Sequence, residues 1–216
     1  MYYYIIYQTD LPFRISLNTG NVLKHENVNI ADLSNADRPT RLVRIYSDLF
    51  DNEWIDALVE LMSKGRLSEK RAIEFLLAIL LNAFQKCRQI IWDRYEAMKS
   101  VASTLDITHR LNSSSNKRLE LLCSVLITGL EINDKDMPNL ARYLTCCVEI
   151  CWEMGIQDNP QHLDIEADKE SGSERMFDTD KFRAYTKTGP KVDYIVWPAL
   201  FVHEGAILSK GIAQGY

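Results

Sequence analysis

The sequence predicts a mainly α-helical domain, a helical bundle around one long central helix with a small C-terminal β-hairpin element. Residues 68–99 repeat apolar side chains at spacings of three and four, which is typical of a helix about 48 Å long. Residues 192–215 instead alternate aliphatic and aromatic side chains around Pro198 and a Gly-containing turn. This second pattern is typical of a β-hairpin.

Changes in composition along the chain predict four segments. Residues 1–37 form an N-terminal arm or strand with a polar loop, and residues 38–158 form the helical bundle. Residues 159–180 hold seven acidic residues against two basic ones, which indicates an acidic loop. Residues 181–216 then form a short helix and the β-hairpin, packed on the bundle.

Local start and stop signals divide the predicted bundle into helices. Pro39 suits the first position of one helix, and Gly65 ends the next. The run 75–81 is apolar all round, which predicts other helices on every side of the first half of the long helix. A further helix is expected within residues 117–131, and a last one between Pro138 and Gly155.

The predicted hairpin is apolar on both of its faces. Residues 194–202 form one strand, residues 203–205 the turn, and residues 207–213 the return. We expect Ile195, Trp197, Ala199 and Phe201 to point inward, and the opposite face to be covered by the N-terminal arm or by a partner. The candidates for a core or an interface are Trp54, Tyr194, Val196, Trp197, Leu200 and Val202.

Composition narrows the class of protein. A net charge of −5 argues against a nucleic-acid partner. The apolar run 75–81 is far shorter than the roughly 20 residues that span a bilayer, so no transmembrane segment is expected. The five cysteines lie in apolar helical patterns, which favours reduced, buried thiols in the cytoplasm over a zinc site.

Sequence motifs for catalysis are missing, whereas basic residues recur along the predicted helices. The chain has no Gly-x-Ser-x-Gly, phosphate-binding loop or dinucleotide fingerprint, so we expect neither an enzyme nor a cofactor or metal. The basic residues form either a solvated surface or a surface for anionic lipid, where each contributes about 1 kcal/mol. They are Arg38, Arg41, Arg44, Lys64, Arg66, Lys70, Arg71, Lys117 and Arg118.

Three stretches, taken in order, resemble the C-terminal domain of the mitochondria-eating protein (Mieap) family. They are SDLFDNEWIDALVEL (47–61), CCVEICWEMGIQDNP (146–160) and FRAYTKTGPKVDYIVWPALFVHEGAILSKGIAQG (182–215). The resemblance implies a non-enzymatic module of mitochondrial quality control that binds the anionic lipid cardiolipin and self-associates. It also implies a cytoplasmic protein peripherally associated with the mitochondrial outer membrane. The alternative is a cytosolic protein-interaction or scaffold domain without lipid contact.

Overall fold

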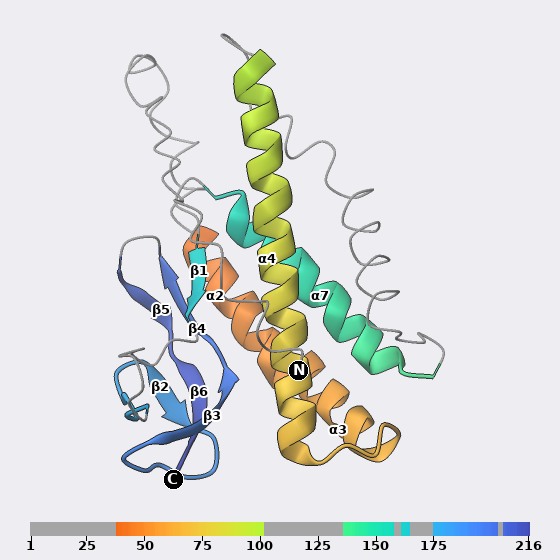
Figure 1. The fold of residues 1–216 in the computed structure, drawn as a ribbon, viewed down its shortest axis with the longest axis vertical. Helices are drawn as coiled ribbons and strands as arrows, with labels where there is room; N and C mark the ends of the chain where they lie inside the picture. Colours follow the sequence, from red (N-terminus) through yellow and green to blue (C-terminus); the bar gives the residue numbers. More distant parts are fainter. Residues whose placement is uncertain (1–37, 102–135, 158–160, 165–174, 203–204) are drawn as a thin grey trace. The chain divides into compact units, whose positions relative to one another are not determined.

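The described part of the chain places its helices first and its strands last (Figure 1). The structure, a computed structural model, describes residues 38–101, 136–157, 161–164, 175–202 and 205–216, all within the unit Asp37–Tyr216. The helical elements are α2 (Arg38–Leu49), η1 (Phe50–Trp54), α3 (Ile55–Ser63), α4 (Glu69–Val101) and α7 (Pro138–Gly155). The strands are β1 (Gln161–Asp164), β2 (Phe182–Ala184), β3 (Val192–Trp197), β4 (Ala199–Val202), β5 (Ile207–Ser209) and β6 (Gly211–Gly215).

The elements α2, η1 and α3 form one continuous helical rod that contains a π-helical turn. Leu49, just before η1, and Ile55, just after it, both keep right-handed helical backbone angles. The buried side chains of α2 are Leu42, Tyr46 and Leu49, and a regular helix would bring residue 53 inward next. The wider π turn takes up one extra residue, so Trp54 enters the core instead.

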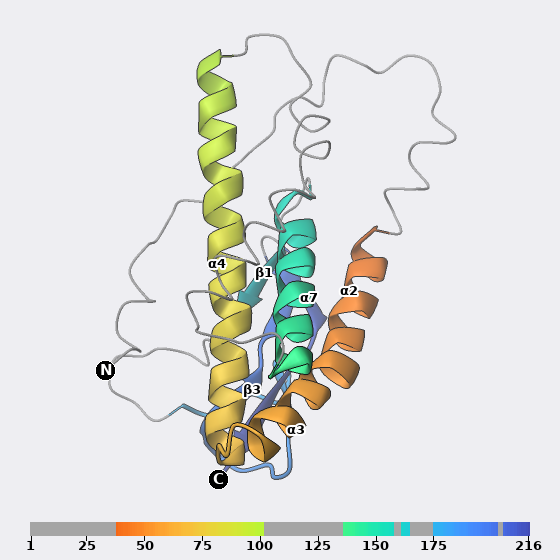
Figure 2. The ribbon, with the colours of Figure 1, turned by 90° about the vertical axis from the view of Figure 1, so that its right-hand side faces the viewer.

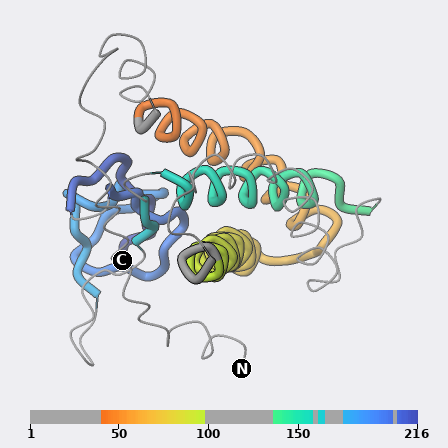
Figure 3. The backbone as a smooth tube through the Cα atoms, turned by 90° about the horizontal axis from the view of Figure 1, so that it is seen from above, coloured from red at the N-terminus to blue at the C-terminus, as the bar shows by residue number. Residues whose placement is uncertain are grey.

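Helix α7 lies between α2 and α4, as two perpendicular views agree (Figures 2 and 3). Its buried side chains are spread around much of its circumference, because neighbours pack on it from more than one side. They are Leu140, Tyr143, Leu144, Cys147, Val148, Ile150, Cys151, Trp152 and Met154. Of the described helices, α7 is therefore the enclosed one.

The predicted fold class, a helical bundle around one long central helix, is wrong. The described elements are three helical rods and two three-stranded sheets, which makes a mixed α/β fold. The expected long helix is present as α4, but it packs on α3 and α7 along one flank and on β3 along another. The apolar run 75–81 misled the prediction because a sheet, rather than further helices, covers part of it: Leu77 packs against the cluster that contains Phe182.

The predicted hairpin is larger than expected, because each of its arms takes part in two sheets. Strand β4 pairs with β5 and β3 pairs with β6, both antiparallel, and the arm 192–202 is interrupted at Pro198. The sheets have the orders β1-β4-β5 and β2-β6-β3. The return arm is interrupted at Lys210, between β5 and β6. At Gly211, the next residue, an added Cβ would be 2.6 Å from the Trp197 carbonyl oxygen, so no side chain fits.

Burial of the 194–202 segment differs from simple alternation. Val196, Trp197 and Leu200 join the main core with the helices, whereas Ile195, Ala199 and Phe201 join a smaller cluster between the strands. The register shift between Ile195 and Trp197 turns Trp197 to the side of Val196. The expected inward set, which grouped Trp197 with Ile195, Ala199 and Phe201, is corrected in this respect.

The short helix expected at the start of residues 181–216 is also absent, and β2 takes its place, parallel to β6. Asp178 Oδ1 accepts hydrogen bonds from the amides of Asp180 and Lys181, which closes a single turn. The chain then extends, because Phe182 is buried in the smaller cluster. The predicted helix within 117–131 and the arm 1–37 lie outside the described residues.

Candidate functional site

Aromatic side chains from the helical rod and from the strand region form one group, here called the aromatic cluster: the buried Tyr46, Trp54 and Trp197 with the half-buried Phe50 and Tyr185. Ring centroids lie 4.9 Å apart for Tyr46 and Trp197, and 5.3 Å apart for Phe50 and Trp197. Phe50 stacks on Trp54 at 4.6 Å, and Tyr185 meets Trp54 edge-on at 6.4 Å. Ring contacts of this kind stabilise the fold in addition to the burial of apolar area. The cluster therefore packs the strand region against the π turn.

Two tyrosines and a cysteine near this cluster are held in the neutral state. The Tyr46 hydroxyl donates to the Pro198 carbonyl oxygen at 2.9 Å, and the Tyr143 hydroxyl donates to the Leu76 carbonyl oxygen at 3.1 Å. Burial raises the pKa of Tyr46, of Tyr143 and of the Cys151 thiol well above their ordinary values. A neutral, enclosed thiol is a poor nucleophile, and the two tyrosine hydroxyls are held in hydrogen bonds within the fold.

A buried carboxylate joins α3 to the start of α7. Glu60 Oε2 accepts from the Leu140 amide at 3.0 Å, which caps a helix whose own N-cap residue offers no side-chain bond. Glu60 Oε1 accepts from Lys64 Nζ at 2.9 Å, and Lys64 also donates to the Asp136 carbonyl oxygen at 3.0 Å. The Lys64 ammonium group is therefore already bound within the fold, by the Glu60 carboxylate and the Asp136 carbonyl oxygen.

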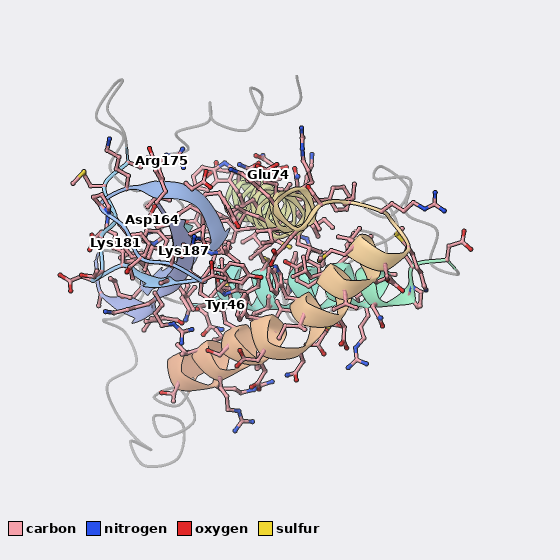
Figure 4. The ribbon with its side chains drawn as sticks, turned by 90° about the horizontal axis from the view of Figure 1, so that it is seen from below. Tyr46, Glu74, Asp164, Arg175, Lys181 and Lys187 are labelled. Atoms are coloured by element: carbon pink, nitrogen blue, oxygen red, sulfur yellow. The ribbon has the colours of Figure 1, made fainter. Side chains whose placement is uncertain are left out.

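One end of the domain gathers basic residues from two segments, the α3–α4 turn with the first turn of α4 (63–71) and the β2–β3 loop (185–193). We call it the basic end, and Figure 4 looks at the domain from that side, with Lys187 labelled on the strand side. The Tyr185 hydroxyl donates to Glu69 Oε1 at 2.7 Å, and Lys70 Nζ donates to Asp193 Oδ1 at 2.7 Å. These bonds hold the two segments side by side.

The basic end carries six basic residues against two acidic ones, and three of the cations have no ion pair in the described part of the chain. These three are Arg66, Arg71 and Lys187, all exposed. Met62 and Leu67 add apolar surface beside them, with 41% and 37% of their area exposed. The combination of unpaired cations and exposed apolar side chains suits an anionic surface with an apolar interior.

Arg66 has an unusual backbone. Its φ of 53° is the only positive value among the described non-glycine residues, and it follows the end of α3. Glycine normally takes this left-handed position after a helix, because other residues are strained there. The turn thus presents an exposed arginine where the backbone favours a glycine.

Comparison with known proteins decides the family. The sequence model of the family described as mitochondria-eating protein matches residues 38–134 and 131–215. No curated protein and no solved structure matches the chain. The matched segments cover most of the sequence. The chain belongs to the mitochondria-eating protein family.

Membership of the mitochondria-eating protein family relates this chain to mitochondrial quality control, and the resemblance predicted from the three stretches is confirmed. The family is not known as an enzyme family. Within the described residues, no group of three histidine, cysteine or acidic side chains is placed to hold a metal ion. None of the described helices has both the length and the apolar content needed to cross a membrane.

The structure separates the basic residues that the sequence singled out. Arg41 and Arg44 are exposed on α2, where Arg41 Nη2 lies 3.9 Å from Glu153 Oε1, and roughly 30 Å of helix separates Arg44 from the basic end. Lys64, Arg66, Lys70 and Arg71 all lie at the basic end, although Lys64 and Lys70 are already paired. Lys117, Arg118 and the side chain of Arg38 lie outside the described residues.

The apolar candidates of this Mieap-family domain lie mostly inside. Trp54, Val196, Trp197 and Leu200 are buried, and Val202 is half-buried on β4. Tyr194 is half-buried, with Lys70 Nζ 4.8 Å from the centre of its ring. Sequence reasoning missed Lys187 and Lys191, whose turn-forming context, Thr-Gly-Pro between two lysines, was the available signal.

Proposed function

We propose that this domain is a non-enzymatic module of mitochondrial quality control whose basic end binds anionic phospholipid, with cardiolipin as the mitochondrial lipid of that class. The observation that carries the proposal is that Arg66 and Arg71 are exposed, make no ion pair in the described part of the chain, and are close in sequence to the exposed Met62 and Leu67. Each cation near an anionic membrane contributes about 1 kcal/mol, and a shallowly inserted leucine adds apolar burial.

The shape of the basic end supports a surface partner rather than a small ligand. Its cations come from a helix turn and a strand loop on either side of the Lys70–Asp193 pair. They do not converge on a buried polar group, since Arg66, Arg71 and Lys187 are all exposed. A bilayer presents many headgroups in one plane and can meet such spread charges together.

The left-handed backbone of Arg66 gives the proposal independent support. A non-glycine residue in this conformation costs on the order of 1 kcal/mol, and its side chain makes no ion pair in the described region that offsets the cost. Charge-assisted hydrogen bonds from the Arg66 guanidinium to a lipid phosphate would offset this cost in the bound state.

Vesicle flotation of the full chain tests the proposal. Vesicles with cardiolipin should carry the protein upward, and neutral vesicles should not. Binding should weaken as salt rises from about 0.05 M to about 0.3 M, because the Debye length shortens to below 10 Å. Failure to bind cardiolipin vesicles at low salt would overturn the proposal.

Two variants with equal changes in net charge locate the surface. Arg71→Glu with Lys187→Glu reverses the basic end, and Arg41→Glu with Arg44→Glu reverses the rival basic surface on α2. We expect the first variant to lose about tenfold or more in vesicle affinity and the second to bind nearly as the native chain does. Equal losses in both would indicate a general charge effect and contradict this assignment.

The second candidate function is a protein-interaction domain without lipid contact. The observation that favours it is the apolar outer face of α3, where Ile55 and Val59 are 44% and 58% exposed. These residues lie beside acidic side chains, which disfavour an anionic membrane at that face. Protein binding that is insensitive to lipid, together with no flotation, would favour this function.

A further inference from the structure

We propose that the outer face of α3 binds a basic amphipathic helix of another protein. Helix α3 packs on α7 and α4, and Figures 2 and 3 show it at the edge of the described helices. Ile55, Val59 and Met62 recur at helical spacing on its outer face, with 44%, 58% and 41% of their area exposed. An apolar stripe of this kind is a surface against which the apolar side of another helix packs.

The charges along the same part of the rod identify the chemistry of the partner. Residues 47–63 contain five acidic side chains and no basic one. Two of the five are already paired within the fold, Glu53 with Arg142 and Glu60 with Lys64. The other three are exposed and form no ion pair in the described part of the chain: Asp48, Asp51 and Asp56. Unpaired acidic side chains beside an apolar stripe favour a partner that is both basic and apolar.

The π turn determines which side chains lie on the outer face. Because η1 brings Trp54 into the core, Ile55 follows it by about 100° of helix rotation and points away from the core. Asp51 lies about one helical turn before Ile55, and Asp56 is its neighbour in the chain. The outer face of the rod is thus acidic toward α2 and apolar toward the end of α3.

This asymmetry predicts the order of side chains in the partner helix. From Asp48 to Met62 the rod extends by roughly 21 Å, which corresponds to about four helical turns. A partner that runs antiparallel to α3 would carry its apolar stripe in its first half and its lysines or arginines in its second half. Basic residues are also favoured at the C-terminal end of a helix by its macrodipole, so we infer the antiparallel orientation.

The expected complex is weak and does not depend on lipid. Contact along one helix face buries less than the roughly 1,200–2,000 Å² of stable complexes, so we expect a dissociation constant in the micromolar range. The inference gives a partner to the second candidate function and does not rest on the lipid-binding proposal. Met62 borders both surfaces, so the variants below change Val59 and the aspartates, and binding is measured without lipid.

Fluorescence anisotropy with a labelled synthetic peptide tests the proposal on the full chain. The probe is about four helical turns long, with leucines at spacings of three and four in its first half and lysines in its second half. The control peptide has the same composition in scrambled order, which keeps the charge and removes the stripe. The native chain should bind the probe about tenfold or more tightly than the scrambled peptide. No binding of the probe at about 200 µM chain, or equal binding of the two peptides, would overturn the proposal.

Two variants and a matched control locate the binding surface. Val59→Asn interrupts the stripe, and Asp51→Lys with Asp56→Lys reverses two of the unpaired charges. Each should weaken probe binding about tenfold or more while thermal unfolding stays within a few degrees, because these side chains are exposed. Asp93→Lys with Asp180→Lys makes the same change in net charge at exposed positions elsewhere and should bind nearly as the native chain does. Equal losses in both double variants would indicate a general charge effect and contradict the assignment.

Sedimentation velocity without the peptide distinguishes a second copy of the chain from a different protein on this face. The native chain and the Val59→Asn chain should sediment alike, because the proposed occupant is absent from both samples. A native dimer that Val59→Asn dissociates would show that a second copy occupies the outer face of α3, and would overturn the proposal.

Discussion

The aromatic cluster and the basic end contrast in most physical properties, although both join the helical rod to the strands. The cluster is centred on the buried Tyr46, Trp54 and Trp197, contains no charged side chain, and is held together by ring contacts and by the hydrogen bond from Tyr46 to the Pro198 carbonyl oxygen. The basic end is exposed, charged and linked by the Lys70–Asp193 and Tyr185–Glu69 bonds. The distinctive stretches of the sequence contribute to both regions: Phe50, Trp54, Tyr185 and Trp197 of the cluster lie in them, and so does the β2–β3 loop of the basic end. The buried rings build the scaffold, and the proposed binding surface uses exposed residues.

The largest expected effect comes from emptying the centre of the aromatic cluster. Trp197 is 2% exposed and contacts both Tyr46 and Phe50. Trp197→Ala should lower the free energy of unfolding by about 3–5 kcal/mol, because it removes a large buried ring and leaves a cavity. Thermal or urea unfolding followed by circular dichroism measures this loss. An unchanged midpoint would contradict the assignment of Trp197 to the core.

A smaller loss is expected from the buried carboxylate between α3 and α7. Glu60→Ala leaves the Leu140 amide and Lys64 without their acceptor, which should cost about 1–3 kcal/mol in urea unfolding. Arg41→Gln is the matched control, since it removes an exposed pair with a 3.9 Å separation, and should change stability by less than about 0.5 kcal/mol. Equal effects in the two variants would contradict the capping role of Glu60.

The neutral tyrosine of the cluster predicts a response to alkaline pH. Burial, followed by the neighbouring Cys151 and Cys147, raises the folded-state pKa of Tyr46 above its unfolded value of about 10. The folded state then holds the tyrosine proton more tightly than the unfolded state does. The contribution of Tyr46 to the free energy of unfolding is therefore complete below about pH 10 and is lost as the pH rises beyond it.

Tyr46→Phe tests this contribution directly. Near neutral pH it should cost about 0.5–1.5 kcal/mol, because the hydrogen bond to the Pro198 carbonyl oxygen is lost. Unfolding midpoints measured between pH 8 and about pH 11 should fall less steeply in the variant than in the native chain. A parallel fall in both would mean that Tyr46 does not contribute to the alkaline response.

The smallest stability effect, with the opposite sign, is expected at the basic end. Arg66→Gly relieves a left-handed backbone at a φ of 53° and should stabilise the fold by up to about 1 kcal/mol. The same change removes a cation that has no ion pair among the described residues, so vesicle binding should weaken. Arg66→Lys separates the two effects, because it keeps both the charge and the strain. A glycine variant that gains no stability would contradict the strain assigned to this turn.

The helices could be predicted from the sequence better than the sheets, for physical reasons. A long periodic pattern marked α4, and Pro138 and Gly155 marked the bounds of α7. Strands β1, β2 and β5 have only three or four residues, too few for a clear alternation, and β2 follows an Asp178 turn that imitates a helix start. The π turn could not be predicted either, since one extra residue changes only the spacing between apolar positions.

The candidate site was predicted only in part. Lys64, Arg66, Lys70 and Arg71 were among the predicted basic candidates, and they lie together in the structure because they are neighbours in the chain. Local sequence could not show that Lys64 forms an ion pair with the buried Glu60, or that Lys70 forms one with Asp193. It also could not show that Lys187 lies at the same end, since that depends on contacts between distant segments. The Tyr185–Glu69 bond joins residues more than a hundred positions apart and has no local signature.

The central claim is that the basic end, rather than the basic surface of α2, meets anionic lipid. Hydrogen–deuterium exchange of the full chain, with cardiolipin vesicles and with neutral vesicles, tests it at the resolution of peptides. We predict that cardiolipin slows exchange in residues 62–71 and 185–191 and leaves residues 40–46 unchanged. Protection confined to the start of α2, or no protection in any described segment under conditions where the chain is bound to the vesicles, would contradict the account.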